Sequence, residues 1–227
     1  DHNANVSSTA QGPVEYETGG SHYVEVVFDG AVDNTNYNYS VFNRAGGEVD
    51  TDIADDYQNN DENVTLAVSS NLNKGATLVV KNDSANSDFK KTYDITTTSA
   101  TLNAQGDQGV YAGEKVAIVN DTRPGTTGYQ IEKDGVQIFQ GDTGTNSSVA
   151  VFDTTDRDED AVYNISVGGN ADNVVDDKPT SVQLLPLGLA VSAENTTNAQ
   201  NLTADISANR GNREVDVTLL ENGDEIT

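Results

Sequence analysis

The sequence predicts an all-β fold built from tandem sandwich domains, and three observations support this class. Short segments in which apolar and polar residues alternate recur along the whole chain, and each is bounded by Gly, Asn, Asp or Ser. Alternation of this kind, punctuated by turn residues, is typical of strands. Apolar residues nowhere recur at helical spacing over three turns, and one strand–turn–strand pattern repeats at a fixed interval.

The predicted strands fall into three sets along the chain. Each strand is rich in β-branched or aromatic residues, which fit a pleated surface with one buried face. The first set is expected at 14–17, 23–28, 37–43, 48–53, 64–69, 77–81 and 90–96. The second set is expected at 115–119, 128–133, 136–140, 149–152, 161–167 and 180–185. The third set begins with 188–193, 202–206 and 214–220.

The repeated pattern places a tight glycine turn between two strands in each of three copies. The turn glycines are Gly47, Gly135 and Gly223, which lie 88 residues apart. Asp-Gly and Asn-Gly in the last two copies favour the type I′ turn that matches strand twist. A period of this length is too long for a solenoid unit, and it fits one immunoglobulin-like β-sandwich.

The repeat divides the chain into domains. Residues 1–19 are expected to form a flexible leader and a first strand, and residues 20–101 and 102–186 two immunoglobulin-like domains. Residues 187–227 would start an incomplete third immunoglobulin-like domain, because they supply too few strands to close a sandwich. We expect this third domain to continue beyond Thr227.

Two tyrosines are expected to have structural rather than catalytic roles. Tyr163 follows an acidic turn at 156–160 and leads a strand. This is the arrangement of a tyrosine that closes the corner between two sheets. Tyr93 is expected to play a related part in the first domain.

The chain is strongly acidic, with 37 Asp plus Glu, 12 Lys plus Arg and a formal net charge of −25. In dilute buffer such a charge destabilises a compact fold, whereas at 1 M salt the Debye length falls to about 3 Å and the self-repulsion is screened. The composition therefore indicates a halophilic protein. Intrinsic disorder, the other class with high net charge, disagrees with the periodic strands. A surface this negative also repels nucleic acid and anionic lipid.

Several function classes are excluded by what the sequence lacks. It contains no Cys, which excludes disulfides and thiolate metal sites, and no apolar run of about 18 residues that would span a membrane. A catalytic base is scarce, because the only histidines are His2 and His22. The sequence has neither a glycine-rich phosphate loop nor a zinc-ligand spacing. We therefore do not expect an enzyme.

The motif that carries most chemistry is Asn-x-Ser/Thr, the acceptor of N-linked glycans in exported proteins. It occurs nine times, whereas random placement of 25 Asn and 39 Ser plus Thr in 227 residues gives about four, and the excess predicts an extracellular glycoprotein. Asn82, Asn120 and Asn146 are best placed, because they lie on predicted turns. Asn38 and Asn164 fall inside predicted strands and need outward-facing side chains. The predicted acceptors are Asn5, Asn38, Asn63, Asn82, Asn120, Asn146, Asn164, Asn195 and Asn201.

One acidic cluster has the spacing of a metal site. Asp156, Asp158 and Asp160 match the opening of an EF-hand loop, but Ala161 then replaces the required Gly and Val167 the bidentate Glu. A solvated acidic face is the favoured interpretation, and a Ca²⁺ or Mg²⁺ site on the three aspartates is the alternative. No cofactor is required, although we expect divalent cations to bridge carboxylates of neighbouring domains.

Two segments, together with the acidic repeats, the dense sequons and the lack of cysteine, resemble haloarchaeal S-layer glycoproteins, which tile the cell envelope. Segment 109–116, Gly-Val-Tyr-Ala-Gly-Glu-Lys-Val, is similar to the Tyr-x-Gly-Glu segment of that family's N-terminal region. Segment 181–189 is similar to a strand that leads from one domain into the next there. The resemblance implies a periodic coat, N-glycans on the sequon asparagines, dependence on divalent cations and a C-terminal membrane anchor.

The function expected from these observations is a structural cell-surface coat that assembles from identical chains. Two other classes remain alternatives. An extracellular filament or pilus subunit with strand exchange would need a neighbouring chain to complete the third repeat. An adhesin or viral spike that binds a receptor would need exposed aromatics on a loop tip, and the 9 Tyr and 5 Phe mostly fall in predicted strands.

Overall fold

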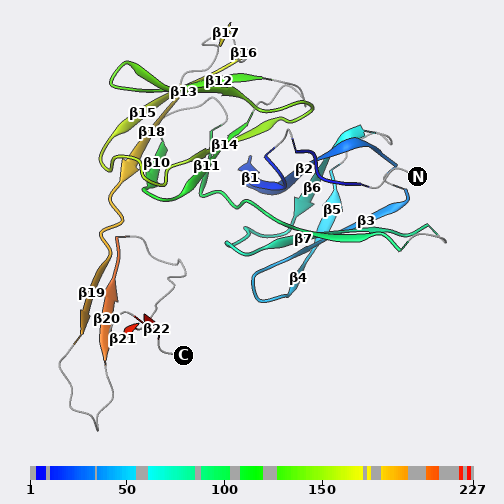
Figure 1. Cartoon of the computed structure of the whole chain (residues 1–227), viewed down its shortest axis with the longest axis horizontal. Helices are drawn as coiled ribbons and strands as arrows, with labels where there is room; N and C mark the ends of the chain where they lie inside the picture. Colours follow the sequence, from blue (N-terminus) through cyan, green and yellow to red (C-terminus); the bar gives the residue numbers. More distant parts are fainter. Residues whose placement is uncertain are drawn as a thin grey trace. The chain divides into compact units, whose positions relative to one another are not determined.

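All regular elements of the structure are β-strands, which confirms the predicted all-β class of tandem sandwiches (Figure 1). The structure is a computed structural model. It describes residues 4–8, 11–33, 35–54, 61–84, 88–102, 108–119, 127–170, 173–174, 180–193, 203–209, 220–221 and 224–225. Within these ranges, no helix is long and apolar enough to cross a membrane.

The first sandwich consists of two four-stranded antiparallel sheets, with the orders β1-β2-β6-β5 and β4-β3-β7-β8. The chain passes from the second sheet to the first between β4 and β5. The strands of the first sheet are β1 (Val14–Thr18), β2 (Ser21–Val32), β6 (Asp61–Val68) and β5 (Thr51–Ile53). The strands of the second sheet are β4 (Glu48–Val49), β3 (Tyr37–Phe42), β7 (Thr77–Asn82) and β8 (Lys90–Asp94).

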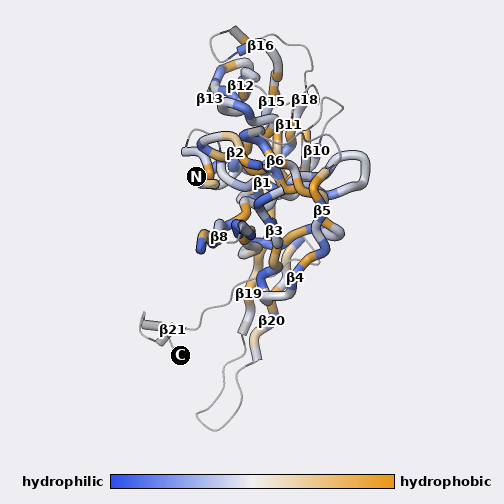
Figure 2. The backbone as a smooth tube through the Cα atoms, turned by 90° about the vertical axis from the view of Figure 1, so that its right-hand side faces the viewer, coloured by the Kyte–Doolittle hydropathy of each residue, from blue (hydrophilic) through white to orange (hydrophobic). Residues whose placement is uncertain are grey.

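The core of the first sandwich draws on both of its sheets. β2 contributes Val24, Val26 and Phe28, because alternate side chains of a strand point to the same face. Leu78 and Val80 of β7 contribute from the second sheet in the same way. The backbone coloured by hydropathy shows this mixture of apolar and polar residues along the strands (Figure 2).

The segment before β1 belongs to the same sandwich. Ala4 is buried in the core, and Val6 forms an antiparallel bridge with Phe28. The hydroxyl group of Tyr93 in β8 donates a hydrogen bond of 3.1 Å to the carbonyl oxygen of Ala4. These residues of the expected leader are therefore fixed against the fold, and Tyr93 is one of the groups that hold them.

The second sandwich pairs a five-stranded sheet, β10-β18-β15-β12-β13, with a three-stranded sheet, β14-β11-β9. Two pairings are parallel, β10 with β18 and β9 with β11, and the others are antiparallel. The larger sheet contains β10 (Gln108–Tyr111), β18 (Thr180–Leu185), β15 (Val162–Val167), β12 (Gly128–Lys133) and β13 (Val136–Asp142). The other strands are β14 (Val149–Asp153), β11 (Lys115–Val119), β9 (Ala100–Leu102), β16 (Gly169–Asn170) and β17 (Asn173–Val174).

Tyr163 lies in the core of the second sandwich and is 1% exposed. Its ring contacts that of Phe152 in the opposite sheet, with a centroid distance of 5.6 Å. Its hydroxyl oxygen accepts a hydrogen bond of 3.0 Å from the backbone N–H of Asp158 in the acidic turn. The predicted tyrosine corner is thereby confirmed.

The hairpin turns follow the glycine pattern with one difference. Asp134 and Gly135 join β12 to β13 with φ angles of 53° and 75°, both in the left-handed region that the predicted type I′ turn requires. In the first sandwich Gly46, with a φ of 81°, takes the left-handed conformation instead of Gly47. The loop between β3 and β4 is longer than a two-residue turn, and its left-handed residue lies one position before the predicted glycine.

Residues Pro186–Thr227 form a second compact unit, separate from Asp1–Leu185. Among its described residues, the strands pair two by two and the side chains of Leu189, Val191 and Ile206 are exposed. The third domain therefore stays a prediction. The strands of this unit are β19 (Ala190–Ala193), β20 (Ala204–Ser207), β21 (Leu220–Glu221) and β22 (Asp224–Glu225).

Candidate functional site

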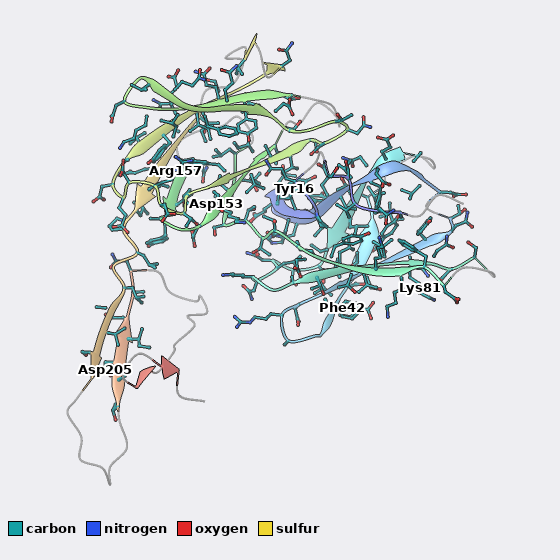
Figure 3. All side chains as sticks on the ribbon, in the orientation of Figure 1. Tyr16, Phe42, Lys81, Asp153, Arg157 and Asp205 are labelled. Atoms are coloured by element: carbon teal, nitrogen blue, oxygen red, sulfur yellow. The ribbon has the colours of Figure 1, made fainter. Side chains whose placement is uncertain are left out.

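The most elaborate polar and apolar contacts outside the two cores lie where the sandwiches of unit Asp1–Leu185 meet. An apolar cluster there joins Val14 and Tyr16 of β1 to Ala117 and Val119 of β11 and to Val149 of β14. Tyr16 is labelled in Figure 3. Contact across an apolar cluster of this kind restrains the relative motion of two domains.

A buried carboxylate forms the polar half of this junction. Glu25 of β2 is 2% exposed, and Oε1 accepts hydrogen bonds of 2.7 Å from Oγ of Ser147 and 3.0 Å from the backbone N–H of Ser148. Oε2 accepts a further hydrogen bond from the hydroxyl group of Ser148. The charge of Glu25 is thus compensated by donors of the second sandwich, as buried charges require.

An amide pair flanks the carboxylate and crosses the same junction. Nδ2 of Asn63 in β6 donates a hydrogen bond of 2.8 Å to the carbonyl oxygen of Asn146. Nδ2 of Asn146 in turn donates to the carboxylate of Glu62. With φ at 59°, Asn146 adopts the left-handed conformation that Asn tolerates better than most residues.

A second buried carboxylate, Glu15 of β1, binds the segment that leads from the first sandwich into the second. Oε2 of Glu15 accepts a hydrogen bond of 3.2 Å from the backbone N–H of Thr98, whose hydroxyl group donates 2.9 Å to the carbonyl oxygen of Glu15. Nδ1 of His22 lies 3.4 Å from Oε1, within ion-pair distance but without hydrogen-bond geometry. Burial raises the pKa of Glu15, and the N–H of Thr98 and the charge of His22 offset part of that rise.

The two sequon asparagines that were predicted inside strands are exposed. Asn38 lies on β3 and Asn164 on β15, each flanked in its strand by residues that turn toward the core. Their side chains therefore face outward, as an acceptor within a strand requires. Nδ2 of Asn38 donates to the carboxylate of Asp83 at the surface.

Asn5 and Asn82 are partly exposed. Oδ1 of Asn5 accepts a hydrogen bond from Nζ of Lys91. Oδ1 of Asn82 accepts a hydrogen bond of 2.8 Å from the backbone N–H of Ser84, the hydroxyl residue of its own sequon. Asn82, predicted on a turn, is instead the last residue of β7 and is paired with Tyr37.

Two predicted acceptors are instead part of the junction. Asn63 is 3% exposed, and its Nδ2, the atom to which a glycan would be joined, is held by Asn146. Asn63 is therefore not among the acceptors proposed below. Asn146 is half-buried, and Ser148, its sequon hydroxyl residue, is hydrogen-bonded to Glu25. The acceptors predicted at Asn120, Asn195 and Asn201 lie outside the described residues.

The aspartates predicted as a metal site are not brought together. Asp158 is engaged by Nζ of Lys133, and Asp156 and Asp160 each occupy a turn position with φ at 60°. In the part of the chain that the structure describes, no group of three His, Cys, Asp or Glu residues could hold a metal ion. The alternate spacing of an EF-hand opening is therefore used here to build the turn before β15.

Few features of the sequence predict the junction. The run from Val24 to Phe28 contains apolar residues on both faces of β2, and Val27 is 2% exposed although it faces away from the core. An apolar residue on the outer face of a strand can indicate a second covered surface. The serines that meet this face lie more than a hundred residues away in sequence.

Known proteins similar to this chain come from haloarchaea. No family model matches it. A cell surface glycoprotein of Haloferax gibbonsii is 32% identical over 211 residues, which cover 91% of this chain and 23% of the relative. Cell surface glycoproteins 1 and 2 of Haloarcula hispanica are each 26% identical and cover 89% of this chain.

This chain belongs to the haloarchaeal cell surface glycoprotein family. As a cell surface glycoprotein it is extracellular, in agreement with its acidity and its sequons. The chain spans 22% to 23% of the length of these relatives.

Similarity of this cell surface glycoprotein to solved structures is weak. SGBP-B of the Bacteroides ovatus mixed-linkage glucan utilization locus, in complex with a heptasaccharide, gives a TM-score of 0.27 at 11% identity, over 88% of this chain and 50% of that one. E. coli alpha-2-macroglobulin gives 0.24 at 15% identity, over 96% and 17%. TM-scores this low support no statement about function.

Proposed function

We propose that this cell surface glycoprotein chain is a structural, non-catalytic part of an extracellular coat of the S-layer type. The buried junction supports this role most directly, because Glu25 of one sandwich is hydrogen-bonded by Ser147 and Ser148 of the next. Domains joined by a sparse interface move relative to one another, whereas a buried contact fixes their orientation. A coat of repeating units needs such rigid spacers.

Exposed sequons support a glycosylated outer surface. Asn38 and Asn164 lie on the outer faces of two different sandwiches, and their side chains are exposed. The relatives are named glycoproteins. We propose that these two asparagines carry N-linked glycans, with Asn5 and Asn82 as further acceptors.

Assembly would join identical chains at molar salt. The net charge of −25 opposes close approach of two copies in dilute buffer, and salt removes this obstacle. Divalent cations would act between carboxylates of neighbouring chains, as diffuse bridges rather than as ions in a built site.

Electron cryo-tomography of cell envelopes tests the coat. The complete protein is deleted in a haloarchaeal host that carries it, and the envelope is compared with that of the parent. Loss of a regular surface array on deletion is expected. A parent without an array, or an array that survives the deletion, would overturn the coat function.

Chelation tests the role of divalent cations separately. Envelopes are treated with EDTA at constant molar NaCl, and a second sample receives EDTA already saturated with Mg²⁺ as the matched control. Release of the protein in the first sample alone is expected. An assembly that stays intact would remove cation bridging and leave the structural role untouched.

A further inference from the structure

Strand β13 is an edge strand that exposes apolar side chains. It ends the order β10-β18-β15-β12-β13, and among the described strands it pairs with β12 alone. Val136, Ile138 and Phe139 are 64%, 37% and 42% exposed. Scattered apolar residues are ordinary on a surface, but three on one edge strand form an apolar surface next to an edge that can pair with another strand.

The inner face of β13 continues the core of the second sandwich. Phe139 is paired in register with Ile131 of β12, and its ring stacks on that of Tyr129 with a centroid distance of 5.4 Å. Ile131 and Tyr129 are buried core residues, while Phe139 is not. Because Phe139 is 42% exposed beside these buried residues of the same face, the core face is incompletely covered at this edge.

Charge separates β13 from the other edges. Proteins commonly protect edge strands from pairing with charged residues, bulges or short length. β1 carries Glu15 and Glu17, β5 carries Asp52, and β8 begins with Lys90. Edge β4 carries Glu48, β14 ends with Asp153, and β9 and β10 are uncharged but only three and four residues long.

The segment from Val136 to Gly141 is six residues long and contains no charge, although it belongs to a chain of net charge −25. Its one protective feature is a register shift opposite Ile131 and Glu132. Val-Gln-Ile-Phe-Gln combines strong strand formers with no Pro and no charge, the composition of segments that pair readily. β13 ends with Asp142, and its residues 136–141 form the longest uncharged run on an edge strand of the described sheets.

High salt allows the partner of β13 to be a second copy of this chain. Two chains of net charge −25 repel each other, but at about 1 M salt the Debye length is about 3 Å. Repulsion then comes only from carboxylates within the contact itself, and residues 136–141 bring none. The carboxylate next to this segment is that of Asp142, the last residue of β13. Like charges directly opposite destabilise paired strands, so an uncharged edge is where two such acidic chains can meet.

We propose that β13 is a self-association edge, at which β13 strands of two copies pair antiparallel about a two-fold axis and bury Val136, Ile138 and Phe139. Two-fold contacts are the commonest closed interfaces, and an exposed edge supplies the backbone donors and acceptors. The contact rests on the proposed coat function and names one of the surfaces through which that coat would assemble.

Cysteine cross-linking tests the pairing, because the chain has no cysteine of its own. In the complete protein, produced in a haloarchaeal host at molar NaCl, Val136, Gln137, Ile138 and Gln140 are replaced by Cys one at a time. The position nearest the two-fold axis faces itself at a distance a disulfide can span, and should give linked dimers. Thr155→Cys, in an exposed turn, is the matched control.

Charge substitution provides the second measurement. Phe139→Glu should weaken self-association by about tenfold or more, because two-fold symmetry introduces each new carboxylate twice. Val162→Glu is the matched control, since Val162 is 46% exposed in the same sandwich. Circular dichroism confirms that both variants are folded, and sedimentation at molar salt measures the dissociation constant.

The outcomes separate this contact from the coat itself. Dimers linked through β13 and lost in Phe139→Glu support it. Absence of linked dimers at all four positions, or equal association of Phe139→Glu and the wild type, overturns it even where tomography shows an intact array. An array that survives the deletion, while the purified protein still forms β13-linked dimers, overturns the coat and leaves the contact standing.

Discussion

Oε1 of Glu25 on β2 accepts a hydrogen bond of 2.7 Å from Oγ of Ser147, which precedes β14 of the other sandwich. The two residues are 122 positions apart in sequence, and both are buried. A buried carboxylate depends on such donors to compensate for the water that it loses. We therefore expect the junction to contribute to the free energy of unfolding as well as to the orientation of the two sandwiches.

Ser148→Ala tests this dependence. It removes the hydroxyl donor to Oε2 of Glu25 and leaves part of a buried charge unsatisfied. The free energy of unfolding should fall by about 1.5–3 kcal/mol, the range for hydrogen bonds to charged groups. Urea unfolding at constant molar NaCl measures the change.

A double-mutant cycle with Glu25→Gln isolates the contact. Because the two residues touch, their effects should be non-additive, with a coupling of about 0.5–3 kcal/mol. Glu17→Gln is the matched control, since Glu17 is an exposed acid at the same end of the molecule, and it should change stability by less than about 0.5 kcal/mol. Additive effects of Ser148→Ala and Glu25→Gln would contradict a working contact.

Glycan occupancy should follow exposure rather than the sequon alone. Peptide mass spectrometry of the protein from a haloarchaeal host should find glycans on Asn164 and none on Asn63, because Asn63 is 3% exposed. Ser166→Ala should remove the glycan at Asn164, whereas Thr65→Ala should leave the glycan mass unchanged. A glycan on Asn63 would show that modification precedes folding and that the junction opens to admit it.

The alternation of apolar and polar residues was enough to place most strands. Segments 115–119, 128–133 and 180–185 were predicted with the bounds that the structure gives to β11, β12 and β18. β12 and β18 alternate, because one face meets the core and the other is more exposed. β11 is buried on both faces, because Ala117 and Val119 belong to the junction, and it was placed by its run of β-branched residues. Local pattern decides the outcome where a strand has one buried face.

Elements defined by distant partners were missed. β9 and β10 have three and four residues, too few for an alternating pattern, and they form by parallel pairing with β11 and β18. Asn63 looked like an acceptor because its sequon is local, while its burial comes from Asn146. The junction likewise arises from tertiary contacts that no local pattern encodes.

Tyr163→Phe tests the tyrosine corner. The buried hydroxyl oxygen of Tyr163 accepts a hydrogen bond from the N–H of Asp158, and Tyr163→Phe removes this bond. The free energy of unfolding should fall by about 0.5–1.5 kcal/mol, the range for a typical hydrogen bond. Asp158→Asn keeps the backbone N–H and changes only an exposed ion pair with Lys133, so it should destabilise the fold less than Tyr163→Phe does. Equal effects of the two substitutions would rule out the backbone contact as the source of stability.

Glu15→Gln should make stability less dependent on pH. Burial raises the folded-state pKa of Glu15 above its ordinary value of 4.5, so folding favours the protonated carboxyl. Its contribution is full below pH 4.5 and is lost as the pH rises through the raised pKa. The variant should therefore melt at a higher temperature than the wild type at pH 7, and the difference should shrink toward about pH 4.

Melting temperatures between about pH 4 and pH 8 at constant salt measure this effect. Glu17→Gln, at an exposed site, should show no such difference. A Glu15→Gln variant that is less stable than the wild type at pH 7 would mean that the ionised pair with His22 outweighs the burial of the charge.

Stability should also depend steeply on salt. The net charge of −25 repels itself across the whole molecule when the Debye length is about 10 Å at 0.1 M salt, and far less when it is about 3 Å at 1 M. Diluting the salt should therefore lower the melting temperature. Sodium chloride and potassium chloride at equal ionic strength should act alike if screening is the cause, whereas sodium sulfate also strengthens apolar burial and should stabilise further. A melting temperature that does not change between 0.1 M and 1 M salt would show that the carboxylates do not repel one another in the folded chain.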